Sequence, residues 1–308
     1  MHIVVVGSGG VGGFFGAKLA KSGQRVTFVA RGAHLAAMRK DGLRIRSAPE
    51  GDWTVAAPAV ETLDGQDPAD LVLFCVKSFD TLSAAELVQP VLASHTAVLS
   101  LQNGIDNEDK LTRVLGPGHV LGGVAYVFAN IEAPGVIAHH QLGRIVFGEL
   151  SAPGSDRASA ILDVLTGASI QAELSPDIRK RLWDKYVFQT AQGGTTAVTR
   201  LPTKLIREVP ETRLLWQRQV EELLAIAEAE NVGFDSGALT RYNQFLDSLA
   251  PANTSSLYQD LANGRRLELD AFHGEALRLG AAHGIPTPTL FAVDAALRPF
   301  VAGAPALN

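Results

Sequence analysis

Three glycines near the start of the chain, Gly7, Gly9 and Gly12, have the spacing G-x-G-x-x-G. The apolar run before them, residues 3–6, predicts a buried strand that ends in a tight turn. The helix expected after this turn has free N–H groups that can bind a diphosphate, and the glycines let the backbone approach it closely. The expected dinucleotide-binding residues are Gly7, Ser8, Gly9, Gly10, Val11 and Gly12.

The elements around this motif fit a dinucleotide site. Residues 11–22 predict a helix that Gly23 can end, and residues 25–30 predict a second strand, which completes a strand–helix–strand unit. A glycine-rich turn that binds no ligand is the alternative. Because the motif lies between the expected strand and the expected helix, we favour the binding site.

Arg31 follows the second predicted strand. At this position dinucleotide-binding folds often place an acidic residue, which accepts a hydrogen bond from the ribose 2′-hydroxyl of NAD. An arginine can instead pair with the 2′-phosphate of NADP. The alternative is a solvated arginine at a strand end. NADP is therefore the expected cofactor.

Two further apolar runs, residues 71–76 and 97–101, predict adjacent strands that deliver polar side chains at their carboxyl ends. Lys77 follows the first run and Asn103 follows the second. Ligands bind at this edge of an open α/β sheet. Asn103 precedes Gly104, so it is either a turn residue or an amide that contacts the nicotinamide or the substrate. The neighbouring lysine favours the functional interpretation.

Lys185 lies on a long helix that is predicted to begin at Pro176, with Ser175 as its N-cap. On a helical wheel it shares one face, about 60° wide, with Ile178, Leu182 and Gln189. The lysine therefore lies on an apolar stripe. Either its stem extends past the stripe to water, or it lines a cleft where a lowered pKa suits proton transfer.

Several polar residues near the end of the chain have the form of helix caps. Residues 253–256 can cap a short helix, and Asn263-Gly264 can end it. Glu268 is expected in the first turn of the next helix, where the helix dipole stabilises a carboxylate. Capping accounts for these residues without any catalytic role.

The predicted elements indicate an α/β fold class, with a Rossmann-type domain over residues 1–175 and an all-helical domain over residues 176–308. Residues 43–46 and 53–56 predict a hairpin at the sheet. Residues 120–149 predict several short strands, with antiparallel pairing open. The helices expected in the second domain cover residues 176–191, 211–231, 236–249, 267–283 and 290–297, with a short one from residue 256.

The composition excludes several classes of protein. The 308 residues are 46% hydrophobic, which is enough to bury a large core. A formal net charge of −5 offers no basic field for nucleic acid, so a small molecule is the expected partner. Cys75, the only cysteine, is expected to pack in the core. A single cysteine also fits a protein of the reducing cytoplasm. No apolar run is long enough to cross a membrane, and no metal site is expected.

These residues resemble the ketopantoate reductase (2-dehydropantoate 2-reductase) family of pantothenate biosynthesis over nearly the whole chain. The resemblance implies a Rossmann domain followed by a helical domain like that of 6-phosphogluconate dehydrogenase. The order and spacing of six motifs are far more specific than any one of them. The motifs are Gly7/Gly9/Gly12 with Arg31, Val76-Lys77-Ser78, Gln102-Asn103-Gly104, Leu182-Trp183-Asp184-Lys185, Ser255-Ser256-Leu257-Tyr258-Gln259-Asp260, and Gly264-Arg265 with Glu268-Leu269-Asp270.

The resemblance also implies a site and a reaction. Lys185 would donate a proton to the substrate's carbonyl oxygen, and Glu268 would tune the lysine and contact the cofactor. Asn103 would lie beside nicotinamide and substrate, Lys77 would help to hold either, and Ser256 would bind the substrate. The implied reaction is NADPH-dependent reduction of a 2-oxo acid, with ketopantoate as the first candidate. The alternatives are a different branched or bulkier 2-oxo acid and a non-catalytic NADP(H)-binding sensor, and a homodimer is left open.

Three positions depart from the pattern of the family. Gln189, expected to bind substrate, and Gly193 stand where asparagines are usual one and two turns after Lys185. His273 replaces an asparagine before Gly274. It is either a changed pocket residue or a residue on a helix surface. These departures leave the identity of the oxo acid open.

Overall fold

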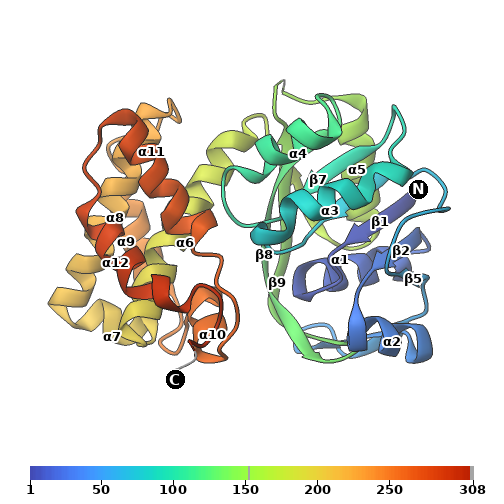
Figure 1. Cartoon of the computed structure of the whole chain (residues 1–308), viewed down its shortest axis with the longest axis horizontal. Coiled ribbons are helices and arrows are strands. Elements are labelled where there is room, and N and C mark those ends of the chain that lie inside the picture. The colour runs from blue at the N-terminus through green and yellow to red at the C-terminus, as the bar shows by residue number, and fades with distance from the viewer. Residues whose placement is uncertain (152, 306–308) are drawn as a thin grey trace. The chain divides into compact units, whose positions relative to one another are not determined.

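The chain divides into two compact units, Met1–Leu182 and Trp183–Asn308 (Figure 1). This computed structural model describes residues 1–151 and 153–305. The first unit contains a sheet with helices, whereas the described residues of the second unit form helices and turns. The predicted fold class, a Rossmann-type domain followed by an all-helical domain, is confirmed.

One ten-stranded sheet organises the first unit, with the strand order β4-β3-β9-β8-β7-β6-β1-β2-β5 and β10 paired with β9. The central strands β7, β6, β1 and β2 run parallel to one another. The strands are β1 His2–Val6, β2 Arg25–Val29, β3 Leu43–Ser47, β4 Trp53–Val55, β5 Ala59–Val60, β6 Leu71–Phe74, β7 Ala97–Ser100, β8 Val120–Ala133, β9 Val136–Glu149 and β10 Gln171–Leu174.

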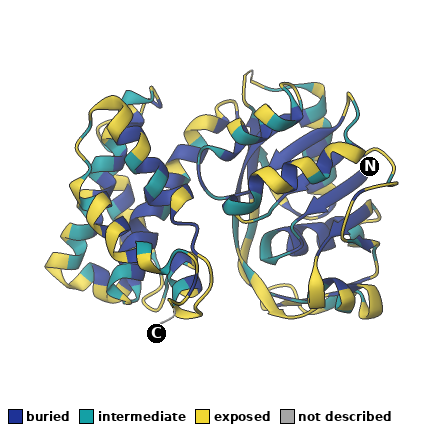
Figure 2. Cartoon of the chain, viewed as in Figure 1, coloured by how far each residue is buried: buried dark blue, intermediate teal, exposed yellow. Residues whose placement is uncertain are grey.

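Helices cover both faces of this sheet, because successive side chains of a buried strand point to opposite faces. Ile3 and Val5 of β1 pack in one core with α1, α2 and α5, whereas Val4 and Val6 pack in another with α3 and α4. Figure 2 shows buried strands inside helices whose outer sides are exposed. The helices are α1 Gly10–Lys21, α2 Gly32–Asp41, α3 Thr81–Val88, α4 Asn107–Leu115 and α5 Asp156–Gly167.

The predicted hairpin between β3 and β4 is confirmed, with Leu43 opposite Val55. The prediction of several short strands over residues 120–149 is wrong. Strands β8 and β9 have 14 residues each and pair antiparallel along their length. Gly143 is an extra residue in β9, since Tyr126 faces Arg144 and the next pair, Val127 with Leu142, skips Gly143.

Helix α6 begins at Ile178, in the last residues of the first unit, and continues into the second unit. The start predicted at residue 176 is wrong, because the Asp177 carboxylate accepts the Lys180 N–H (3.0 Å) and caps the helix two residues later. The helix continues to Thr199 rather than ending near residue 191. The helices are α6 Ile178–Thr199, α7 Thr203–Glu208, α8 Pro210–Ala229, α9 Ala238–Ser248, α10 Ser256–Ala262, α11 Glu275–His283 and α12 Pro288–Leu297.

Two further differences affect the second unit. Helix α7 was not expected from the sequence. The single helix expected over residues 267–283 is wrong in its first part, because residues Asp270–Gly274 form a π-helical turn, hereafter the π turn, before α11 begins. Such a turn inserts a residue into the helical ladder, which the spacing of apolar residues does not reveal.

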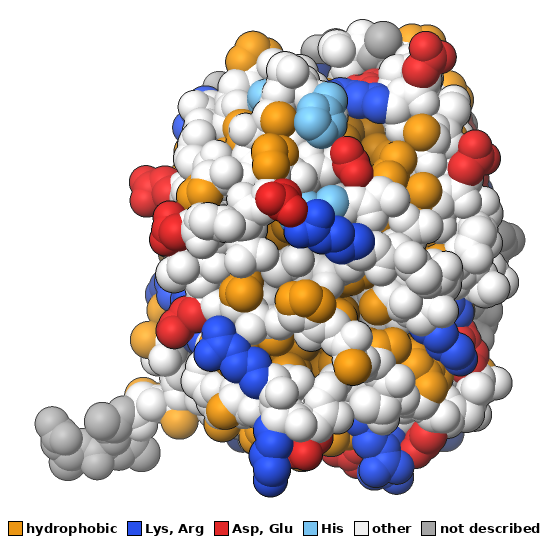
Figure 3. All heavy atoms as spheres, turned by 90° about the vertical axis from the view of Figure 1, so that its right-hand side faces the viewer, with side chains coloured by type: hydrophobic (Ala, Val, Ile, Leu, Met, Phe, Trp, Pro, Cys, Tyr) orange, Lys and Arg blue, Asp and Glu red, His pale blue; other side chains and the backbone are white. Residues whose placement is uncertain are grey.

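The described ranges contain no helix that is long and apolar enough to cross a membrane. Figure 3 shows one face of the first unit, where Lys and Arg side chains lie interspersed with Asp and Glu side chains. This mixture is expected of a chain with 27 basic and 32 acidic residues. Cys75 is half-buried, and burial raises the pKa of its thiol, as expected of a packing residue.

Candidate active site

Four neighbouring parallel strands carry the predicted cofactor residues at one edge of the sheet. In spatial order, β7 leads to Asn103, β6 to Lys77, β1 to the glycine motif and β2 to Arg31. Strands β6 and β7 are adjacent, as predicted, and pair Phe74 with Ser100 at their carboxyl ends. The sheet therefore brings together the residues that the sequence places at strand ends.

Each of the three glycines in the motif is explained by a different feature of the structure. Gly7 has φ +94°, and a Cβ there would lie 2.7 Å from the Val76 nitrogen. A Cβ at Gly12 would clash with the Gly7 carbonyl, so Gly12 allows helix α1 to pack on the strand. A Cβ at Gly9 would meet no atom within 4 Å. The open space beside Gly9 fits the close approach of a ligand.

The N-terminus of α1 suits an anion. Its N-cap, Gly9, provides no side-chain hydrogen bond, and its fully described first turn contains no acidic residue. N–H groups at such a terminus can bind a diphosphate. Ser8 donates its hydroxyl to the Val29 carbonyl (2.8 Å), which holds the loop to β2. A Cβ at Gly10 would clash with the Ala129 carbonyl of β8, so the long hairpin lies against the loop.

His34 fixes the same loop, although no motif in the sequence singles it out. Its Nδ1 accepts the Gly135 N–H (3.0 Å), so Nε2 carries the proton and donates to the Ser8 carbonyl (2.9 Å). Burial lowers the pKa of His34, which favours this neutral form. Arg31, three residues earlier, is exposed at the N-cap of α2. It is therefore accessible to an anionic group of a cofactor.

A polar network joins the ends of β6 and β7 beneath Asn103. Gln102 donates from Nε2 to the Val76 carbonyl (3.1 Å) and to the Thr81 hydroxyl (2.8 Å). Asn107 donates from Nδ2 to the Asn103 carbonyl (2.7 Å). These contacts hold the turn that presents the half-buried Asn103. The sequence did not single out the threonine or the second asparagine, since both resemble ordinary helix-start residues.

Glu108, in the first turn of α4, is a buried carboxyl that the sequence did not reveal. It is 4% exposed, and burial raises its pKa from 4.5 to about 7, against smaller opposite effects of its own N–H and the Ser100 hydroxyl. The native protein therefore keeps this proton between pH 4.5 and 7, while the unfolded chain releases it. The free energy of unfolding consequently falls as the pH rises through this window.

Glu108→Gln is expected to remove this loss. Relative to the wild type, the variant should gain stability progressively above pH 5 and reach up to about 3 kcal/mol at pH 8. Urea unfolding at pH 5, 6, 7 and 8 checks this, with the exposed Glu86→Gln as the control. Parallel pH dependences for wild type and Glu108→Gln would contradict the buried protonated carboxyl.

Lys185 and Glu268, the predicted catalytic residues, both lie in the second unit and interact electrostatically. Glu268 is 5% exposed, and Lys185 is half-buried. Burial lowers the pKa of Lys185 to about 8, and the Glu268 carboxylate opposes this effect. Of the two interpretations of this lysine, the lowered pKa favours the proton donor over a side chain that extends to water.

The expected substrate residues lie on α6 and α10. Gln189 is half-buried one turn after Lys185, and Ser256 is exposed as the first residue of α10. The predicted cap of α10 is confirmed, because Ser255 accepts the Tyr258 N–H (3.0 Å). Its hydroxyl also lies 2.6 Å from that of Thr196, which joins α10 to α6. The structure thus places these residues but does not test their roles.

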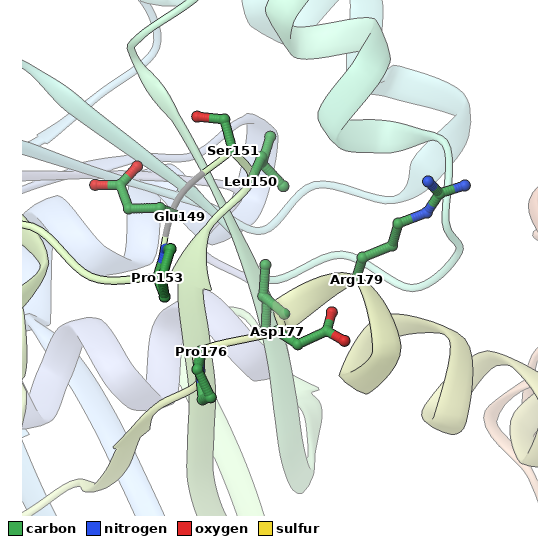
Figure 4. Close-up of a pocket in the computed structure, with 8 residues that line it drawn as sticks. Glu149, Leu150, Ser151, Pro153, Pro176, Asp177 and Arg179 are labelled. Carbon is green, nitrogen blue, oxygen red and sulfur yellow. The ribbon is translucent and has the colours of Figure 1, made fainter. Parts of the chain in front are cut away.

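Two solvent-open hollows lie elsewhere in the first unit. One, of about 190 Å³, is lined by the end of β9 and the start of α6, including Glu149, Ser151 and Arg179 (Figure 4). The other, of about 590 Å³, lies between residues 38–42 and 56–59. No predicted site residue lines either hollow. Within the described ranges, no three His, Cys, Asp or Glu side chains are placed to hold a metal ion.

Comparison with known proteins gives one consistent result. Residues 3–152 match the family described as ketopantoate reductase PanE/ApbA, and residues 177–300 match its C-terminal domain. The chain belongs to this family. Its members are NAD(P)-dependent oxidoreductases, and the predicted resemblance is confirmed.

Individual relatives cover nearly the whole chain. The 2-dehydropantoate 2-reductase of Mesorhizobium japonicum is 31% identical, over 97% of this chain and 97% of its own, and that of Halobacterium salinarum is 30% identical, over 94% and 95%. The crystal structure of a PanE/ApbA family ketopantoate reductase from Ralstonia eutropha has a TM-score of 0.90 and 33% identity, over 98% of both chains. A D-mandelate dehydrogenase bound to NADH and anilino(oxo)acetate has a TM-score of 0.91 at 21% identity, over 98% of both chains, which shows the shared fold alone.

The departures from the family pattern have different surroundings. His273 is fully buried, so its interpretation as a helix-surface residue is wrong. Its Nε2 lies 3.0 Å from Gln219 Oε1, and a Cβ at Gly194 would clash with the ring. Gly193 is buried. A Cβ built at Gly193 would lie 3.6 Å from the Cδ2 atom of Leu257. The space at Gly193 is therefore bordered by an apolar side chain.

Proposed function

We propose that the chain reduces a 2-oxo acid to a 2-hydroxy acid with NADPH, and that ketopantoate, reduced to pantoate, is its substrate. The observation that carries the proposal is Lys185, whose pKa burial lowers to about 8 and whose charged form the buried Glu268 carboxylate stabilises. Family membership supports the reaction, since relatives that match the full chain are named 2-dehydropantoate 2-reductases.

Residues of the first unit fit the dinucleotide. The open space at Gly9 and the uncapped start of α1 suit the diphosphate, and the exposed Arg31 suits a 2′-phosphate. Lys77 and Asn103 follow strands on one side of this motif and would hold the nicotinamide end or the substrate. When bound, NADPH supplies the hydride that the reaction needs.

Residues of the second unit would supply the proton. As C2 of the oxo acid gains hydride, negative charge develops on its oxygen, and the Lys185 ammonium stabilises this charge and donates a proton from Nζ. Glu268 keeps the lysine protonated against the effect of burial. We assign substrate contacts to Gln189 and Ser256, and a cofactor contact to Glu268. A pKa of about 8 leaves the lysine largely protonated at neutral pH.

Arg31→Ala is expected to weaken NADPH binding about ten- to a hundredfold, because a charge-assisted bidentate contact contributes about 1.5–3 kcal/mol. NADH affinity should change little. Fluorescence titration with both cofactors checks this, and Arg25→Ala, an exposed arginine at the opposite end of β2, is the control. Equal losses for both cofactors would give Arg31 a structural role, and a wild type that prefers NADH would refute the NADP assignment.

A panel of 2-oxo acids tests the substrate. Ketopantoate should give the highest kcat/KM when NADPH consumption is followed. A bulkier or more branched oxo acid is the second candidate, because Gln189, Gly193 and His273 depart from the family pattern. If ketopantoate is slower by orders of magnitude, this second candidate replaces it. Gly193→Asn should then lower activity toward the bulkier acid more than toward ketopantoate.

A non-catalytic NADP(H) sensor is the alternative of a different class. A sensor needs no proton donor, so Lys185 and Glu268 argue against it. Tight NADPH binding without turnover across the panel would support it. We also propose that the protein is located in the cytoplasm and that its domain boundary lies at residues 175–176. We further propose that the chain forms a homodimer. Light scattering would test the homodimer.

A further inference from the structure

The π turn begins two residues after Glu268 and is hydrogen-bonded to the Glu268 carbonyl. The Glu268 carbonyl accepts the N–H groups of Ala271 (3.2 Å) and Phe272 (3.3 Å), and Gly274 donates to the Leu269 carbonyl (3.0 Å). π-helical turns occur often at functional sites and need support from their surroundings. If this turn relaxed to an α-helix, the residues before it would rotate by about 100° for each residue of shift. The backbone of the π turn is therefore coupled to the backbone of Glu268.

One hydrogen bond joins this turn to the helix that carries the lysine. Tyr186, the residue after Lys185 on α6, donates its hydroxyl to the Phe272 carbonyl (2.5 Å). Tyr186 is 1% exposed and Phe272 is 3% exposed, so water does not compete for this bond. The chain of contacts from Tyr186 through the backbone of Phe272 ends at the Glu268 carbonyl.

A buried polar network holds the other side of the turn. His273 is hydrogen-bonded through Nε2 to Gln219 Oε1 (3.0 Å), and Gln219 donates from Nε2 to the Thr195 hydroxyl (2.8 Å). All three side chains are fully buried. Gly194 leaves room for the imidazole, because a Cβ there would clash with Nε2. The π turn is thus attached to α6 and, through Gln219, to α8.

We propose that Tyr186 is a positioning residue, which holds the π turn and thereby fixes the Glu268 carboxylate beside the Lys185 ammonium. The His273–Gln219–Thr195 network supports the same turn from its other side. The catalytic consequence rests on the proposed function. The geometric claim does not, because it concerns only how two ionisable groups are placed within the second unit.

The ionisation of Lys185 reports this placement directly. Glu268 raises the pKa of Lys185 while burial lowers it, so a carboxylate that turns away lets the pKa fall. Other charged groups near these elements have partners of their own. Asp184 accepts the Tyr242 hydroxyl (2.9 Å), and Asp270 pairs with Arg298. These groups should keep their places when the Tyr186 hydroxyl is removed.

Tyr186→Phe in the full chain tests the proposal, because it removes the hydroxyl and keeps the ring. The pH dependence of Lys185 acylation, followed by peptide mass spectrometry, gives its pKa without any substrate. We expect this pKa to fall by about half a unit to one unit. We expect kcat at pH 8 to fall about two- to sixfold, because the protonated fraction of Lys185 falls by this factor, with a smaller change in KM. The alkaline limb of the kcat profile should move to lower pH by the same amount as the labelled pKa.

Tyr242→Phe is the matched control, since it removes a hydroxyl that contacts Asp184 rather than the π turn. Tyr242→Phe should leave the pKa of Lys185 unchanged. It should lower the melting temperature about as much as Tyr186→Phe does. Thr195→Val, which removes the end of the second network, should shift the pKa in the same direction, and Thr195→Ser should not. These variants keep the test informative if one of them folds poorly.

If Lys185 has the same pKa in Tyr186→Phe as in the wild type, the proposal is overturned, even if kcat falls. A lowered pKa in Tyr186→Phe but not in Tyr242→Phe would support it. If that shift occurs and the wild type nevertheless oxidises no NADPH with any 2-oxo acid, the positioning stands and the proposed function fails. The two failures are therefore distinguishable.

Discussion

Lys185→Ala is expected to lower kcat for 2-oxo acid reduction by about 10²- to 10⁴-fold, the usual range for a lost general acid. The ammonium acts as charge develops on the substrate oxygen, so the loss should appear mainly in kcat. NADPH binding should survive, because the residues assigned to the diphosphate and the 2′-phosphate lie in the first unit. Steady-state kinetics and NADPH titration together check this.

The pH profile of the wild type belongs to the same prediction. A proton donor works only in its protonated form, so kcat should be constant below the Lys185 pKa of about 8 and fall tenfold per unit above it. Lys180→Ala, an exposed lysine on the same helix, should leave rate and profile unchanged. Near wild-type turnover by Lys185→Ala would remove the catalytic role and leave a lysine that only packs its stem.

Glu268→Gln is expected to lower kcat by about 10- to 10³-fold, a loss weaker than or comparable to that of Lys185→Ala. The amide keeps the volume of the buried side chain but removes the charge that favours the lysine ammonium. The alkaline limb of kcat should therefore move below pH 8. Measured kcat from pH 6 to 9 checks both the size of the loss and its direction.

The double variant tests whether the two residues act together. If they do, Lys185→Ala/Glu268→Gln should lose much less than the product of the two single losses. Glu228→Gln, an exposed glutamate on α8, is the control for the amide substitution. Fully multiplicative losses would show that lysine and glutamate act independently, and an unmoved alkaline limb would show that Glu268 does not tune Lys185.

Features that depend on local sequence were predictable. The glycine motif, the flanking strands and the polar residues at strand ends follow from short apolar runs and turn residues, so the edge of the sheet was correctly predicted. The helical stripe of Ile178 and Leu182 was also correct, since both pack against Val124 and Val146. These patterns need no knowledge of distant contacts.

Features that depend on distant contacts were not predictable. His34 contacts Gly135, 101 residues away, and Tyr186 contacts Phe272, 86 residues away. No local pattern encodes either partner. The long β8–β9 hairpin is not predictable from local sequence, because the extra residue at Gly143 interrupts the two-residue alternation that marks one strand. The π turn was missed because one inserted residue leaves the apolar spacing nearly helical.

The central claim is that this chain reduces a 2-oxo acid with NADPH through Lys185. The most direct measurement mixes purified protein with NADPH and ketopantoate, follows NADPH consumption, and identifies the product by mass spectrometry. The account predicts pantoate formed in a one-to-one ratio with the NADPH oxidised, and a rate that Lys185→Ala reduces at least about a hundredfold. NADPH that binds tightly but is not oxidised with ketopantoate or any other 2-oxo acid would contradict it.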